Sequence, residues 1–158
     1  GRTEIERLID IDSEPRILGD TLYLAAYRGS VAAIDMRNGN LVWNRELSSY
    51  AGLDVDERQV YLSDDSDAVI ALDRRSGGTL WKQPELTGRR LSAPAASGDY
   101  VVVGDFEGYL HWLRKDNGRI VGRIRASGKT IVAPPLAAGG IVFVQGQGGA
   151  LSAFRVGE

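Results

Sequence analysis

The sequence contains no cysteine and a single histidine, His111. Without cysteine, the chain can form no disulfide framework, no thiolate metal site and no cysteine nucleophile. A lone histidine has no second His or Cys with which to share a metal ion, and no nucleophile-elbow motif accompanies it. We therefore expect His111 to be structural, its neighbour Trp112 to serve packing, and the chain to hold no metal.

Long apolar runs and an excess of one charge are also missing. The uncharged apolar runs are far shorter than a membrane span. The 19 basic and 21 acidic side chains give a net charge of −2, and neither half has the dense basic stripe of a nucleic-acid binder. With 43% hydrophobic and 25% charged residues, the 158-residue chain is typical of one soluble globular domain. Since Gly1 is no initiator and no signal peptide follows, we expect a piece of a longer chain.

A repeat of about forty residues organises the sequence. Its frame is a turn glycine with an Asp four residues before it and a Trp four residues after it. The repeated positions are Asp35, Gly39 and Trp43, then Asp73, Gly77 and Trp81, then Gly118, where Arg114 and Gly122 replace the Asp and the Trp. The turn glycines lie 38 and 41 residues apart, a period typical of stacked or radially arranged units.

Each repeat contains four short β-rich runs separated by turn dipeptides, which predicts an all-β fold made of β-propeller blades. We expect one partial propeller domain over residues 1–158, with about four four-stranded blades. The predicted units are an orphan strand at 1–11 and blades at 12–48, 49–87, 88–127 and 128–158, the last without its fourth strand. The repeat Trp would fill the space between blades. Gly122 occupies this position in the third repeat, so we expect another residue to fill the space beside the third blade.

The frame around Asp35 and Trp43 resembles the PQQ-type propeller repeat. Three stretches, Thr3–Asp12, Val103–Trp112 and Trp43–Leu47, are more specifically similar to the BamB family, the propeller lipoproteins of the bacterial outer-membrane β-barrel assembly machine. The resemblance implies the C-terminal half of an eight-bladed propeller on the periplasmic face of the outer membrane. It also implies a lipid anchor in a part that precedes this chain.

The predicted partner site lies near the start of the chain. Asp10 and Asp12 follow a strand and point to one side of it, with Ile11 on the other. From the residues alone, they read as solvated loop acids or as caps of backbone N–H groups. The family resemblance implies instead that this Asp-x-Asp docks the POTRA domains of BamA through basic groups, with Arg7 as a further contact. Unfolded outer-membrane proteins are a further expected partner.

A second acidic group, Asp64, Asp65 and Asp67, forms a predicted turn. A Ca²⁺ loop needs more oxygen ligands at set spacing, with a Gly and a terminal Glu, which are missing here. We therefore interpret these residues as solvated turn acids.

The function we expect is a non-catalytic scaffold that docks BamA and aids insertion of β-barrel proteins. One alternative is a fragment of a PQQ-dependent dehydrogenase, and another is a generic propeller adaptor. A dehydrogenase would need a PQQ pocket, a Ca²⁺ site and a catalytic Asp, and many have a vicinal Cys pair. The sequence has no Cys and no cluster of oxygen ligands, so we expect no cofactor. The aspartates at positions 35 and 73 recur in register, which favours a structural role over catalysis.

The last expectation concerns how an incomplete propeller ring closes. Incomplete blades leave strand edges and apolar faces in water. The strand Glu4–Ile9 could complete the fourth blade of its own chain, which would give a four-bladed ring. Alternatively, two chains could exchange this strand, so that each completes the other's fourth blade and together they form a ring of eight blades. Since blades shaped for an eightfold ring resist a steeper tilt, we expect a homodimer.

Overall fold

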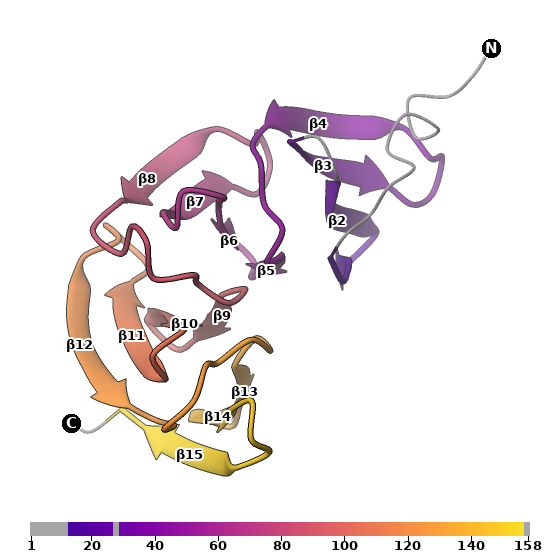
Figure 1. The fold of residues 1–158 in the computed structure, drawn as a ribbon. Helices are drawn as coiled ribbons and strands as arrows, with labels where there is room; N and C mark the ends of the chain where they lie inside the picture. Colours follow the sequence, from indigo (N-terminus) through magenta and orange to yellow (C-terminus); the bar gives the residue numbers. More distant parts are fainter. Residues whose placement is uncertain (1–12, 27–28, 157–158) are drawn as a thin grey trace.

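The computed structural model describes residues 13–26 and 29–156 and consists of four antiparallel sheets in chain order. The described residues contain no helix, and therefore none that could cross a membrane. The sheets follow one another around an arc, as the blades of a propeller do (Figure 1). The first strands of neighbouring sheets contact one another on the inside of the arc. The all-β propeller fragment predicted from the sequence is confirmed.

The strands are short, and each sheet is a meander whose strands pair in the order of the sequence. Their bounds are β1 Arg16–Leu18, β2 Thr21–Ala26, β3 Ser30–Asp35, β4 Leu41–Glu46, β5 Leu53–Val55, β6 Gln59–Ser63, β7 Val69–Asp73, β8 Thr79–Gln83, β9 Ala95–Ser97, β10 Tyr100–Gly104, β11 Tyr109–Arg114, β12 Ile120–Arg125, β13 Leu136–Ala138, β14 Ile141–Gln145 and β15 Leu151–Arg155. We call the sheets β1–β4, β5–β8, β9–β12 and β13–β15 blades 1 to 4.

The repeat glycines form the turns between the third and fourth strands of blades 1 to 3. Gly39, Gly77 and Gly118 have φ of +72°, +75° and +74°, a left-handed conformation that glycine adopts without steric cost. The repeat aspartate before each of the first two turns accepts hydrogen bonds from the turn backbone. Asp73 Oδ1 accepts from the N–H groups of Arg75 and Ser76, each at 2.9 Å. Glycine and aspartate recur because the turn needs both.

The repeat tryptophans lie between blades. Trp43 and Trp81 are only 7% and 8% exposed. The indole N–H of Trp43 donates to the carbonyl of Arg74 in blade 2 at 2.8 Å, and that of Trp81 donates to Lys115 in blade 3 at 2.7 Å. A Cβ added to Gly77 would lie 2.6 Å from the indole of Trp43. Each ring therefore rests on the next blade's turn, where only glycine leaves room.

Blade 3 carries its indole on a different strand. In blades 1 and 2 the repeat Trp pairs across the ladder with Ala33 and Ala71. In blade 3 the small residue is Gly122 on β12, and its cross-strand partner is Trp112 on β11. Trp112 packs edge-on against Phe154 of blade 4, with ring centroids 6.4 Å apart. The large and the small residue have exchanged strands, so an aromatic ring still fills the interface.

A buried polar network supports blade 3. Asp105 is fully buried and accepts hydrogen bonds from His111 Nε2 and Arg89 Nε, both at 2.7 Å. Burial alone would raise the pKa of Asp105, but these two partners and the backbone N–H of Tyr109 lower it. Burial, together with the charges of Arg89 and Arg123, lowers the pKa of His111 despite the attraction of Asp105. His111 is therefore a neutral donor that fixes Asp105 in place.

The first prediction concerns the indole between blades. Trp81→Ala should lower the free energy of unfolding by about 3–5 kcal/mol, because it empties a large buried site. Leu80→Ala on the same strand is the control, since Leu80 is 50% exposed, and it should cost about 0.5 kcal/mol or less. Denaturant titrations of both variants measure the difference. Equal shifts in the two variants would contradict the packing role.

The second prediction concerns pH. His111 is the only histidine. Because its folded pKa lies below the unfolded value of about 6.5, the unfolded chain binds the proton more readily. The stability that neutral His111 provides is complete above about pH 6.5 and declines as the pH falls toward the folded pKa, by at most about 1.4 kcal/mol per pH unit.

This pH dependence can be measured by urea unfolding at several pH values on the acidic side of neutrality, with His111→Gln as the control. The amide of Gln can still donate to Asp105 but cannot titrate. The stability of the Gln variant should change less with pH than that of the original chain. Parallel pH profiles for the two proteins would show that His111 does not cause the effect.

Candidate partner-binding face

The meander places loops at two opposite ends of the blades. The connection end carries the links between blades and the turns between second and third strands, at 48–52, 64–68, 84–94, 105–108, 126–135 and 146–150. The turn end carries the other two turns of each blade, at 19–20, 36–40, 56–58, 74–78, 98–99, 115–119 and 139–140. The two ends differ in chemistry.

The connection end is hollowed by a depression of about 610 Å³ that spans blades 2, 3 and 4. Its lining includes three large apolar side chains that are exposed, Tyr50, Phe106 and Val132, at 62%, 38% and 61%. The acidic turn between β6 and β7 lines it as well. Exposed apolar side chains beside charged ones, gathered in a hollow, are typical of a surface that binds another protein. We call this surface the connection-end hollow.

Two of the three acidic residues of that turn accept hydrogen bonds from backbone N–H groups, one within the turn and one in the next link. Asp64 Oδ1 accepts from the N–H groups of Ser66 and Ala68, each at 2.9 Å. Asp67 has a left-handed φ of +61° and accepts from the N–H of Leu91 at 3.0 Å, which ties the turn to the next connection. Both are half-buried, so the interpretation as solvated acids holds only for Asp65, which is exposed. Across the described ranges, no group of three potential metal ligands occurs.

The predicted docking residues Asp10, Asp12 and Arg7 lie outside the described residues. The residue next to them in the sequence is described, and it lies at the connection end. A Cβ on Gly52 would lie 3.1 Å from the Cβ of Ser13, and Ser13 Oγ donates to the carbonyl of Ala25 at 3.4 Å. The described chain therefore begins beside the link that carries Tyr50.

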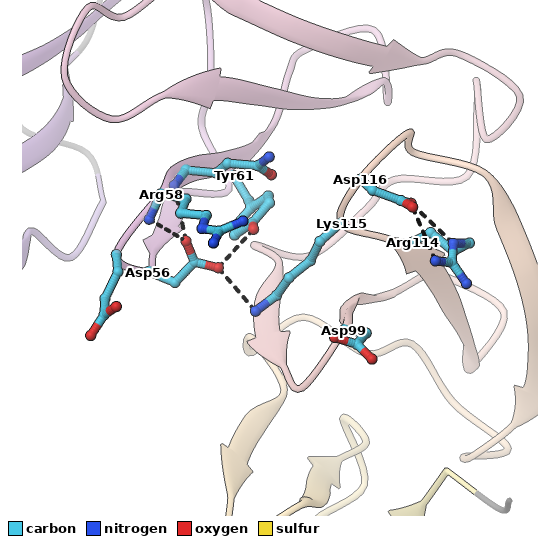
Figure 2. A pocket seen from close by; sticks show the side chains of 9 residues that line it. Asp56, Arg58, Tyr61, Asp99, Arg114, Lys115 and Asp116 are labelled. Atoms are coloured by element: carbon cyan, nitrogen blue, oxygen red, sulfur yellow. Dashed lines mark hydrogen bonds and ion pairs between the residues drawn. The ribbon is translucent and has the colours of Figure 1, made fainter.

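The turn end has a hollow of about 640 Å³ between blades 2 and 3, and Figure 2 shows the charged side chains that line it. At its centre Asp56 accepts a hydrogen bond from the Tyr61 hydroxyl at 2.7 Å and pairs with Lys115 Nζ at 2.9 Å. Burial would raise the pKa of Asp56, but Lys115, Tyr61 and two backbone N–H groups lower it. Burial and the neighbouring Asp56 carboxylate raise the pKa of Tyr61.

The ion pair at the centre of this hollow joins the two blades. Lys115 extends from blade 3 to Asp56 in blade 2, and it lies 5.8 Å from the centroid of the Tyr61 ring. Arg114 and Asp116 in the same hollow pair with each other at 3.0 Å (Figure 2). Because the pair of Asp56 with Lys115 crosses from blade 2 to blade 3, we interpret it as an electrostatic link between the two blades.

Sequence reasoning singled out the acidic turn of the connection-end hollow but missed its exposed apolar residues and the charged residues of the turn-end hollow. Tyr50 and Val132 do carry a signal, since each is a large apolar side chain in a link between blades, just after a fourth strand. The pairing of Asp56 with Lys115 carries none, because the two residues are far apart in the sequence and neither occupies a repeat position.

Comparison with known proteins supplies the family. The family described as outer membrane protein assembly factor BamB matches residues 1–83 and 66–157. The chain is 43% identical over 156 residues to outer membrane protein assembly factor BamB of Pseudomonas aeruginosa, and 39% identical over 158 residues to that of Alkalilimnicola ehrlichii. These two matches include 99% and 100% of this chain, and the chain spans 41% of the length of each relative.

A solved structure agrees with these matches. The crystal structure of BamB from Moraxella catarrhalis superposes with a TM-score of 0.85 at 29% identity, over 92% of this chain and 43% of that one. These relatives are assembly factors, which agrees with the prediction of a protein that is not an enzyme. With matches of this extent in sequence and in fold, the chain belongs to the family of the outer membrane protein assembly factor BamB.

Proposed function

We propose that the chain is part of a non-catalytic scaffold for outer-membrane protein assembly, and that it docks the POTRA domains of BamA through its connection end. The observation that carries the proposal is the connection-end hollow, where exposed Tyr50 and Val132 stand beside the acidic turn around Asp65. Aromatic anchors in a hollow supply most of the energy of typical protein interfaces. The relatives are named assembly factors of outer-membrane proteins, which supports this assignment.

The acidic groups define the chemistry of the partner. Asp65 is exposed, and Asp10 and Asp12 precede Ser13, which lies at the same end of the blades. A partner surface with basic groups around an apolar centre would complement this face, and charge complementarity would orient it and speed its association. The periplasmic face of the outer membrane, with a lipid anchor elsewhere in the full-length protein, is the location that this role requires.

The third prediction tests the apolar centre. Tyr50→Ser combined with Val132→Ser should weaken binding to isolated POTRA domains by about tenfold or more, the loss expected when two anchors leave an interface. Calorimetric titration of the full chain against the POTRA domains measures the affinity. Both side chains are largely exposed, so the fold should persist, which circular dichroism checks. An unchanged affinity would remove the hollow from the interface.

The fourth prediction tests the acidic residues near the start of the chain. Asp10→Arg combined with Asp12→Arg places like charges against a basic partner and should cost about 2–5 kcal/mol of binding free energy. The matched control is Asp20→Arg with Asp99→Arg, which changes the net charge equally at the turn end, where both residues are exposed. If both pairs weaken binding to the same extent, net charge rather than a specific contact is responsible.

A further inference from the structure

Three arginines converge on one tyrosine at the outer part of blade 3. The guanidinium carbons of Arg89, Arg123 and Arg125 lie 5.7, 5.0 and 5.7 Å from the centroid of the Tyr109 ring. Arg123 and Arg125 come from β12, the outermost strand of the blade, and Arg89 comes from the link between β8 and β9. We call these four residues the Tyr109 cluster. None of them lines the connection-end hollow.

The cluster is held from below by the buried network of blade 3. Arg89 Nε donates to the buried carboxylate of Asp105 at 2.7 Å, so this guanidinium has a fixed position. The same carboxylate accepts from the backbone N–H of Tyr109 at 3.0 Å, which fixes the start of β11. A recognition site gains affinity when its groups are positioned before the ligand arrives, because less conformational entropy is lost on binding.

The other two arginines have no acidic partner among the described residues, and Arg125 Nε donates to the carbonyl of Ser127 at 3.4 Å. Arg123 and Arg125 are exposed, alternate along β12 and stand opposite His111 and Tyr109 in the strand register, so they share one face. Within the described part of the chain, neither has a carboxylate within 4.0 Å, since Asp105 and Glu107 pair with Arg89. A ring has two faces, so at least two of the three cations share one. An anion bound beside Arg123 and Arg125 would reduce the repulsion between these like charges.

We propose that the Tyr109 cluster binds an acidic segment of a partner protein through carboxylate groups. Guanidinium groups bind carboxylates in a bidentate manner, and the Tyr109 hydroxyl is a further donor. Arginine and tyrosine are the residues enriched at the energetic centres of protein interfaces. A membrane surface fits less well, because polybasic lipid-binding segments carry about four to eight Lys/Arg, against three here. The proposed site is separate from the connection-end hollow and does not depend on POTRA docking.

The test measures binding of a fluorescent oligoglutamate peptide to the full chain by anisotropy. Arg123→Gln with Arg125→Gln should weaken binding by about tenfold or more, the loss expected when two charged contacts are removed. The matched control is Arg75→Gln with Arg119→Gln, which removes the same charge from two exposed arginines at the turn end and should leave the affinity within about twofold of the original, as expected of charges that make no contact. Tyr109→Leu, which keeps every charge but removes the ring, should also weaken binding.

Arg89 is left unchanged in all variants, because it neutralises the buried Asp105. Thermal unfolding curves check that each variant folds. Equal losses in the two arginine pairs, or no measurable binding by the original chain, would overturn the proposal. Tighter binding to vesicles of phosphatidylcholine with phosphatidylglycerol than to the peptide, lost with Arg123→Gln and Arg125→Gln, would overturn it in favour of a membrane surface. Tyr50→Ser with Val132→Ser should not affect the peptide, which keeps this test independent of the POTRA test.

Discussion

The contact of an indole with the next blade's glycine turn is the constraint on which the arrangement of blades 1 to 3 depends. A four-stranded blade cannot bury its own faces, so its stability comes from its neighbours. Trp43 and Trp81 each place a ring on a turn glycine and donate a hydrogen bond to the carbonyl just after the third strand of the next blade. One side chain thereby sets both the separation and the register of two sheets. The glycine turn and the large residue recur together because the ring fits only against a turn that has no Cβ.

The interface between blades 3 and 4 shows what can vary under this constraint. In this interface the indole is on β11 instead of the fourth strand, and Trp112 fills the space between the sheets by packing against Phe154. The hydrogen bond is not kept, since Trp112 Nε1 is buried without a partner among the described residues. A depression of about 360 Å³ lies beside Trp112 and Gly122. Filling the space between the sheets is thus the stricter requirement. The indole N–H hydrogen bond adds to the interfaces made by Trp43 and Trp81, but the interface between blades 3 and 4 forms without it.

The sequence predicted the architecture well because the repeat encodes it locally. The recurring turn glycine, the Asp before it and the alternating β-branched residues can be recognised without knowing any contact. The structure adds the φ near +74° of that glycine and the hydrogen bonds of that Asp. Trp112 could be assigned to packing, but its exchange with Gly122 required the strand register, which one sequence does not contain. The same limit applies to the connection-end hollow and to the Tyr109 cluster. Both join residues from several blades or links, so only the packed sheets bring them together.

The two ends of the blades have different freedom to acquire function. At the turn end, the tryptophan rings pack against the turn glycines, and the ion pair of Asp56 with Lys115 joins blades 2 and 3. A substitution there therefore disturbs an interface between blades. The indoles of Trp43 and Trp81 do not pack against the links at the connection end, so Tyr50 and Val132 can be exposed there without loss of packing. The outer strand β12 has similar freedom, since Arg123 and Arg125 project from a strand with only one neighbour in its sheet. Partner chemistry therefore gathers where inter-blade packing leaves residues free.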